Sequence, residues 1–418
     1  MTVAPAGRRW AEVDHNWAVV VAAFVASAVA FLGLFNFGIF LDALTRDFGT
    51  GKGQVAAVFS VTTVVYYLCG MAAGRLADRY GPRPIVGAAA VLIGTGFVIG
   101  AQVRHLWQLG LVWAVTVGPG VGASYSPLVA AVGSWFVRRR ALALGLAMSG
   151  AGFGILAGAP LCSALLRAHG WRTSFELIGL GSAVLLGVCA LVSSRRGGPS
   201  AVALAPMGPL VRSTTFRLLF AAVALLSLAF FTPFVFLASY ARAQGIGAAT
   251  TSLIVGMVGV SSTFGRLVLA GFGSRLGEVR LYQVSHALMA VSFAVWLVAG
   301  RSTPGLFAFS ILMGTGYGGF VALAPAVLAG HFGIERLGGL IGTLYSALGI
   351  GSALSPPLVG WMTDAVGSGA GVAFALVAST AAFAVTSRIG RPEAGTVGDA
   401  QAPNAEPDRG ATVPKGEP

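Results

Sequence analysis

The stretch Gly256–Gly277, GMVGVSSTFGRLVLAGFGSRLG, places one arginine inside a long run of apolar and small side chains. As a helix, residues 251–273 are long enough to cross a hydrocarbon core of about 30 Å, and Arg266 lies about one turn from the middle of that run. An arginine near the centre of a lipid-facing helix costs about 2.5–3.5 kcal/mol, so such residues normally face a bundle interior or a watery cavity. We therefore predict a functional role for Arg266. The alternative is a structural arginine that pairs with a neighbouring helix or reaches the nearer surface.

Apolar runs of similar length recur along the whole chain. Of the 418 residues, 56% are hydrophobic, only 10% are charged and 60 are glycine, which excludes a soluble domain and indicates a polytopic, all-α membrane protein. Cys69, Cys162 and Cys189 fall inside apolar runs at unrelated spacings. This pattern argues against a disulfide framework or a metal site, and the sequence implies no cofactor.

The apolar runs predict twelve transmembrane helices in two six-helix halves. We expect a cytoplasmic N-terminal segment at 1–16, an N-terminal half at 17–194, a cytoplasmic linker at 195–214, a C-terminal half at 215–388 and a disordered cytoplasmic tail at 389–418. The predicted spans lie near 17–41, 54–77, 84–103, 106–134, 141–166, 173–194, 215–241, 248–273, 281–299, 303–329, 338–363 and 369–388.

The basic residues test this layout through the excess of Lys and Arg in cytoplasmic loops. Of the 27 Lys+Arg, Arg266 lies inside a span and 19 fall at the termini or in loops assigned to the cytoplasm; the seven assigned outside are Arg46, Lys52, Arg104, Arg167, Arg172, Arg242 and Arg301. Topology therefore accounts for the net charge of +13, and nucleic-acid binding is not needed to explain it. The 25 arginines against 2 lysines favour a GC-rich bacterial source, so we expect a multi-pass protein of the bacterial inner membrane with both termini cytoplasmic.

Short motifs recur between the two halves at a constant spacing. GPGVG at 118–122 returns as GTGYG at 314–318, an offset of 196, and Phe136 is matched by Phe332 at the same offset. AGRLADRYG at 73–81 is echoed by AGFGSRLG at 270–277. The common offset favours two homologous halves that hold a substrate between them near the midplane, a known plan for transporters.

The stretch GRLADRYGPRP, 74–84, is expected to form a tight cytoplasmic turn in which Gly74 and Gly81 permit close backbone approach and Asp78 bonds helix N-terminal amides. It resembles the loop signature of the major facilitator superfamily, and matches it at Gly74, Asp78, Arg79, Gly81 and Arg83. The resemblance implies a gating clamp on the cytoplasmic side rather than a substrate contact.

Within that superfamily the chain resembles the monocarboxylate porter and oxalate:formate antiporter branch over most of its ordered length. The matching stretches are DHNW (14–17), where His15 and Asn16 replace glycines, FGIF (37–40), SYSPLVAAVGSWFVRRRALALGLAMSGAGFG (124–154), FTPFVFLASYARAQGI (231–246) and GVSSTFGR (259–266).

The resemblance implies that Arg266 binds the substrate carboxylate. Ser262 stands where animal members have an aspartate, Phe35 where they have a lysine in the first helix, and Leu348 where oxalate carriers have a lysine in the eleventh. One planar guanidinium binds one carboxylate through two hydrogen bonds, whereas a dicarboxylate would leave its second charge unpartnered. A small monocarboxylate is therefore the expected substrate.

Other side chains near the span centres are candidates to line the path, because hydroxyls and amides orient a polar ligand while aromatic rings supply apolar walls. Tyr125 is the strongest of them, since the resemblance places a tyrosine there. For each, an ordinary interhelical hydrogen bond is the alternative. The remaining candidates are Asn36, Phe35, Tyr66, Ser149, Ser262, Tyr345 and Ser346.

These observations predict a secondary active transporter that moves a small organic anion by alternating access, with a proton or a counter-anion as the co-ion, and that works in the lipid bilayer as a monomer. A facilitator-fold carrier of an unrelated small solute, such as a drug or a sugar, is the alternative. An enzyme is disfavoured because no cluster of nucleophile, metal ligands or paired carboxylates occurs in the spans, and a channel because one arginine does not make a ring.

Overall fold

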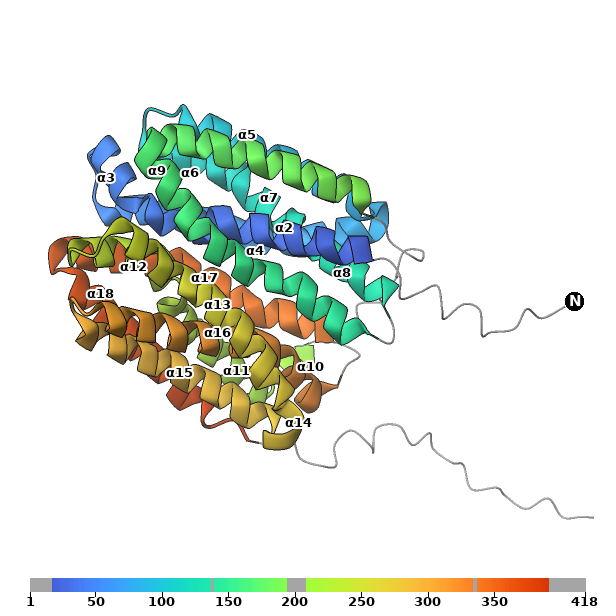
Figure 1. The fold of residues 1–418 in the computed structure, drawn as a ribbon. Coiled ribbons are helices and arrows are strands. Elements are labelled where there is room, and N and C mark those ends of the chain that lie inside the picture. The colour runs from blue at the N-terminus through green and yellow to red at the C-terminus, as the bar shows by residue number, and fades with distance from the viewer. Residues whose placement is uncertain (1–16, 137–138, 194–207, 334–336, 391–418) are drawn as a thin grey trace, which may run out of the picture.

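The computed structural model describes residues 17–136, 139–193, 208–333 and 337–390, and these residues form helices with no strand among them (Figure 1). The expected segment 1–16, most of the expected linker and nearly all of the expected tail lie outside the described residues. The linker ends in a short helix, α10, Gly208–Val211.

The helices gather in two groups that follow the chain order (Figure 1). The first group contains α2 (Trp17–Phe35), η1 (Phe37–Ile39), α3 (Leu41–Phe48), α4 (Lys52–Tyr80), α5 (Pro82–Ala101), α6 (Leu106–Val115), α7 (Val117–Ser124), α8 (Ser126–Trp135) and α9 (Arg140–Val192). The second contains α11 (Thr214–Phe230), α12 (Thr232–Ala243), α13 (Ala248–Gly271), α14 (Gly273–Leu276), α15 (Glu278–Ala299), α16 (Thr303–Phe332), α17 (Leu337–Ala365) and α18 (Ser368–Thr386).

The predicted number of spans agrees with the described helices. Ten helical segments are long and apolar enough to cross a membrane. One of them, Leu142–Val192, contains two helices joined at Gly170, whose φ of 76° reverses the chain direction. Counting it as two and adding the 29-residue α17 gives twelve.

Three spans that the sequence predicts as continuous helices are interrupted. The first breaks at Asn36 between α2 and η1, the seventh at Phe231 between α11 and α12, and the fourth at Thr116 and Tyr125. A proline lies in the first turn of α12 and of α8. The N–H groups of a first turn have no partner within the helix, so the proline costs no helical hydrogen bond there. The backbone can therefore bend at these points within the bundle.

The internal repeat is visible in the backbone. Left-handed glycines occur at Gly49 (φ 62°) and Gly245 (φ 82°), and at Gly81 (φ 85°) and Gly277 (φ 87°), each pair 196 residues apart. Glycine is needed at these turns because other side chains adopt positive φ only with strain. The offset of 196 found in the sequence is thus the offset between equivalent turns.

Helix packing follows the same offset. A methyl group added at Gly118 would meet the Thr62 carbonyl oxygen, and one at Gly314 would meet the carbonyl oxygen of Val258, which lies 196 residues after Thr62. Likewise Gly122 packs on the backbone of Tyr66 and Gly70, and Gly318 on the backbone of Ser262 and Arg266. Small residues let helices approach closely in a bundle. Each repeated glycine motif therefore serves as a packing surface, and Arg266 occupies the position of Gly70 in the other half.

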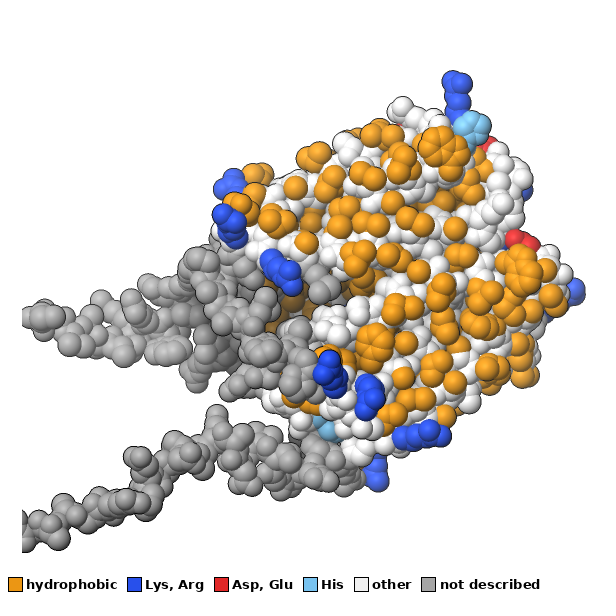
Figure 2. All heavy atoms as spheres, turned by 180° about the vertical axis from the view of Figure 1, so that it is seen from behind, with side chains coloured by type: hydrophobic (Ala, Val, Ile, Leu, Met, Phe, Trp, Pro, Cys, Tyr) orange, Lys and Arg blue, Asp and Glu red, His pale blue; other side chains and the backbone are white. Residues whose placement is uncertain are grey.

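The two ends of the bundle differ in charge. We call them the α3 end, which carries α3 and the turn between α12 and α13, and the α14 end, which carries α14 and both ends of the described chain (Figure 1). Figure 2 shows Lys and Arg side chains gathered at the α14 end and a broad apolar surface between the ends. Such a surface fits the hydrocarbon core of a membrane.

Candidate substrate cavity

A cavity of about 1020 Å³ lies between the two groups of helices. Its walls come from α2, α4, α8 and α9 on one side and from α11, α13, α16 and α17 on the other. The lining residues of α4 (64–70) lie at the middle of that helix, and those of α17 (341–354) run from near its start, at the α14 end, to just past its middle. The cavity therefore occupies the middle of the bundle and extends toward the α14 end.

Arg266 is the only charged residue among the described residues that line this cavity. It is half-buried on α13, and its Nη1 donates to the Met148 carbonyl oxygen of α9 at 2.9 Å. Its guanidinium carbon lies 5.5 Å from the centre of the Tyr317 ring, a cation–π distance. Its Nε is buried without an acceptor. The cation thus touches both halves and keeps unused donors.

No described carboxylate pairs with Arg266. The ion pairs among the described residues join Lys52 with Asp42, Arg242 with Asp42, and Arg172 with Asp47. A half-buried guanidinium held by a carbonyl and by Tyr317, with no described carboxylate beside it, is an incompletely neutralised charge. It is therefore suited to receive an anion from outside the protein.

The glycine motif at 314–318 explains how Tyr317 reaches Arg266. Because Gly314 and Gly318 lie against the backbone of α13, the α16 helix approaches α13 closely at this point. Tyr317 precedes Gly318 and lies over the guanidinium, while its ring also packs edge-on against Phe230 of α11 at 5.0 Å. The repeat motif therefore builds one wall of the site.

Six of the predicted site residues line the cavity, and three do not. Those that line it are Arg266, Tyr125, Phe35, Tyr66, Tyr345 and Ser346. Tyr66 and Tyr125 share a hydrogen bond of 2.8 Å between their hydroxyls. Tyr345 donates to the Val321 carbonyl oxygen at 3.4 Å.

The other three predicted residues, Asn36, Ser149 and Ser262, bond to helix carbonyls instead. Asn36 is buried and donates from Nδ2 to the carbonyl oxygens of Leu32 and Gly154, which ties α2 to α9. Ser149 donates to Leu146 and Ser262 to Gly259. Asn36 thus joins two helices, whereas Ser149 and Ser262 bond within their own helices, and none of the three lines the cavity.

Several lining residues were not anticipated from the sequence. The aromatic ones among them are Phe31, Tyr67, Phe230, Tyr317 and Phe320. Tyr317 could have been found from the sequence, because it lies in the repeated motif GTGYG at 314–318. Phe35 and Leu348, the two positions where the resemblance placed lysines in relatives, do line the cavity, so apolar side chains stand there.

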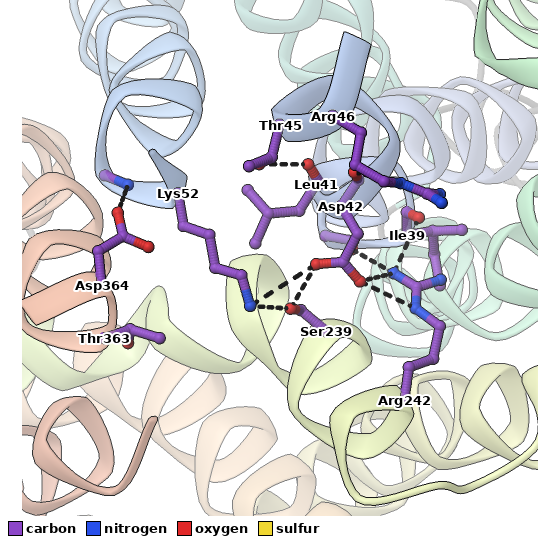
Figure 3. A network of polar contacts seen from close by, with 12 residues as sticks. Ile39, Leu41, Asp42, Thr45, Arg46, Lys52, Ser239, Arg242, Thr363 and Asp364 are labelled. Carbon is purple, nitrogen blue, oxygen red and sulfur yellow. Dashed lines mark hydrogen bonds and ion pairs between the residues drawn. The ribbon is translucent and has the colours of Figure 1, made fainter. Parts of the chain in front are cut away.

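A second polar cluster joins the halves at the α3 end (Figure 3). Asp42 of α3 pairs with Arg242 of α12, with an Nη2–Oδ2 distance of 3.0 Å, and accepts a hydrogen bond from Ser239 at 2.6 Å. Lys52 donates to Ser239 at 2.7 Å and lies 3.7 Å from Asp42. The Gly53 amide donates to Asp364 of α17 at 3.2 Å. We call these five side chains, Asp42, Lys52, Ser239, Arg242 and Asp364, the interlock.

The predicted gating motif lies at the junction of α4 and α5, at the α14 end. Gly81 forms the turn itself with its positive φ, and Arg79 is exposed over the Tyr80 ring at 5.3 Å. Arg83 is exposed, and the Asp78 side chain lies outside the described residues. Among the described residues no close backbone approach is seen at either glycine, since a Cβ added at Gly74 or Gly81 meets no described atom within 4 Å.

In the described part of the chain, twelve apolar helices in two repeated halves, with a cavity and one lining cation between them, define a membrane transport protein. The chain belongs to the Major Facilitator Superfamily, whose sequence profile matches residues 23–302 and 219–412.

Relatives place the chain in the monocarboxylate porter branch. Monocarboxylate transporter 13 of Bos taurus is 29% identical over 364 residues, which cover 84% of each chain. Monocarboxylate transporter 3 of Rattus norvegicus is 30% identical over 369 residues, 84% of this chain and 74% of the relative. Monocarboxylate transporter 11 of Homo sapiens is 29% identical over 382 residues, 88% of this chain and 80% of the relative. The predicted family and fold are confirmed.

A solved structure shares the fold. It is the crystal structure of a bacterial homolog to the human lysosomal transporter Spinster, in an inward-facing and unoccupied conformation. The TM-score is 0.73 at 14% sequence identity, and the match covers 89% of this chain and 97% of that one.

Proposed function

We propose that the protein is a secondary active transporter that moves a small organic anion, a monocarboxylate in particular, and that Arg266 binds the carboxylate. The observation that carries this proposal is that Arg266 is the one charge among the described cavity residues and has no described carboxylate partner. The names of the relatives support the same substrate class.

The charge of the cavity limits the substrate. A guanidinium offers five N–H donors, and Met148 uses one of those of Arg266. A single carboxylate neutralises the cation with charge-assisted hydrogen bonds, whereas the second carboxylate of a dicarboxylate would face Phe35, Leu348 or other uncharged lining. The proposal is therefore one carboxylate for each transport event.

The basic side chains support an orientation in the bacterial inner membrane with the α14 end and both termini in the cytoplasm (Figure 2). In that orientation the cavity belongs to the cytoplasmic side, and the interlock closes the outer side. Alternating access would then require the interlock to open while the halves close at the α14 end, where the motif of Asp78, Arg79 and Arg83 lies. A proton or a counter-anion is the co-ion, and the monomer is the working unit.

Binding to purified Arg266 variants tests the proposal. We expect Arg266→Ala and Arg266→Lys both to weaken propionate binding about 30-fold or more, because an ammonium lacks the planar pair of donors. Isothermal titration calorimetry measures the affinity, and uptake of radiolabelled propionate into proteoliposomes measures transport. Arg301→Ala, an exposed arginine at the α3 end, is the matched control.

Unchanged propionate binding by Arg266→Ala would refute the carboxylate role. If Arg266→Ala does not fold but Arg266→Lys folds and binds as the wild type does, Arg266 is a structural residue. The apolar lining also fits a carrier of neutral solutes, the second candidate function. Transport of such a solute by folded Arg266→Ala at the wild-type rate would favour it.

A further inference from the structure

Nine aromatic rings line the cavity beside Arg266, among the residues that the structure describes. They are Phe31, Phe35, Tyr66, Tyr67, Tyr125, Phe230, Tyr317, Phe320 and Tyr345. This is more aromatic surface than the binding of a two- or three-carbon acid requires. The proposed carboxylate role of Arg266 leaves this surface unexplained.

The rings form a connected wall that starts at the cation. The guanidinium lies 5.5 Å from Tyr317, and Tyr317 lies 5.0 Å from Phe230. Phe230 contacts Phe234, a buried ring behind the lining, and Phe234 contacts Phe35 of the other half, with centroid separations of 5.6 and 4.9 Å. The wall therefore crosses from the C-terminal half to the N-terminal half.

On the N-terminal side the wall continues toward α4. Phe35 stacks on Phe31 at 4.6 Å, Phe31 meets Tyr125 edge-on at 5.8 Å, and Tyr66 lies 4.5 Å from Tyr67. Tyr66 and Tyr125 are joined by their hydroxyls. A ligand held at Arg266 would thus have aromatic faces and edges within reach on both halves.

Four of the eight hydroxyl protons of the described lining are used in hydrogen bonds within the protein. Ser27 donates to the Ala23 carbonyl oxygen at 2.8 Å and Ser346 to the Thr343 carbonyl oxygen at 2.7 Å. Tyr345 donates to Val321, and Tyr66 and Tyr125 bond to each other. The aromatic rings, by contrast, present apolar faces on both halves, so we expect the part of the ligand away from its carboxylate to be mainly apolar.

Flat rings pack against aromatic walls in edge-to-face or offset arrangements that saturated chains do not reproduce. We infer that the preferred substrates are monocarboxylates that carry an aryl group, with the carboxylate on Arg266 and the aryl ring against the aromatic wall. This inference rests on the proposed function and names the substrate class of the same site. Phenylacetate is the simplest probe.

Calorimetry with three acids tests the inference on the wild-type protein. We expect phenylacetate to bind about tenfold or more tightly than propionate, because its ring buries additional apolar area. Cyclohexylacetate, of similar size but without a flat ring, should bind several-fold more weakly than phenylacetate. Equal affinities for phenylacetate and cyclohexylacetate, or for phenylacetate and propionate, overturn the inference.

Tyr67 offers a matched pair of variants, because its half-buried ring lines the cavity. Tyr67→Phe keeps the ring and should bind phenylacetate as the wild type does. Tyr67→Leu removes the ring and should lose several-fold more affinity for phenylacetate than for propionate. Tyr80→Leu, an exposed tyrosine at the end of the same helix, is the control.

The outcomes separate the two proposals. If Arg266→Ala abolishes propionate binding but Tyr67→Leu leaves phenylacetate binding unchanged and phenylacetate holds no advantage, the carboxylate role stands and the aryl preference fails. If Arg266→Ala binds both acids as the wild type does, the proposed function itself fails.

Discussion

Two arginines of the C-terminal half, Arg242 and Arg266, bond to residues of the N-terminal half, and their surroundings differ in charge. Arg242 at the α3 end pairs with Asp42 and also donates to the Ile39 carbonyl oxygen at 3.2 Å. Arg266 in the cavity donates to a single carbonyl oxygen, that of Met148, and has no described carboxylate. The same side chain is therefore neutralised within the protein at one site and left incomplete at the other.

The difference indicates a division of roles along the bundle. At the α3 end the charges of one half satisfy those of the other, which holds that end closed without a ligand. In the proposed mechanism an anion satisfies the charge in the cavity and then joins the halves through Arg266. The conformation of such a carrier would depend on whether the ion pair at the α3 end or the anion contact at Arg266 is formed.

The largest expected effect is that of Asp42→Asn on the closed state of the α3 end. The substitution leaves Arg242 and Lys52 without their shared carboxylate, at side chains that are 25–29% exposed. We expect the closed α3 end to lose about 1–2 kcal/mol, or roughly tenfold in population. The measurement is labelling of Ser346→Cys, which lines the cavity, by an impermeant thiol reagent outside whole cells, in a background without Cys69, Cys162 and Cys189.

The control for that experiment is Asp364→Asn, because an amide oxygen still accepts the Gly53 amide proton. Labelling from outside should rise in Asp42→Asn and stay near the reference rate in Asp364→Asn. An unchanged rate in Asp42→Asn would mean that the interlock does not hold the end closed. Rapid labelling from outside in the reference protein would contradict the proposed orientation.

A second change sharpens the comparison by adding a cation to the cavity. Leu348 lines the cavity on α17, so Leu348→Lys should place an ammonium in the same space as Arg266. We expect malonate affinity to rise about fivefold or more, since the second carboxylate then gains a partner. Calorimetry measures it, with Ser387→Lys at the exposed end of α18 as control. No gain in malonate affinity would argue that charge count does not select the substrate.

The smallest effect on binding is expected for Asp78→Asn. If the motif of the α4–α5 turn stabilises one gate state, the variant should transport propionate more slowly in proteoliposomes while its calorimetric affinity stays within a few-fold of the wild type. This outcome would separate the gate at the α14 end from the cavity that binds the anion. Normal transport rates in Asp78→Asn would refute the gating role.

Much of the fold was predictable because membrane spans are set by local composition. Helices α5, α13 and α15 begin and end within three residues of the predicted spans. The breaks at Asn36 and Phe231 were not predicted, since an apolar run gives no sign of where a helix bends against another half. Positive-φ turns at Gly81 and Gly277 matched the repeat offset, because turn geometry is local.

The site was predictable only in part, and Arg266 shows why. A charge inside an apolar run is recognisable from the sequence alone, and the structure places Arg266 in the cavity lining. Asn36 and Ser262 do not line the cavity, because burial and helix rotation decide whether a polar side chain faces a cavity or a neighbouring carbonyl. Tyr67 and Phe230 were missed for the same reason.

The sequence by itself determined that this is a membrane protein of two repeated halves, which side carries the basic loops, and which charge lies inside a span. These properties follow from composition and periodicity along the chain. Only the tertiary structure decided that Asp42 meets Arg242, 200 residues away, while Arg266 meets a carbonyl and the ring of Tyr317. Contacts between halves depend on how helices rotate and pack in three dimensions, and no single stretch of sequence records that.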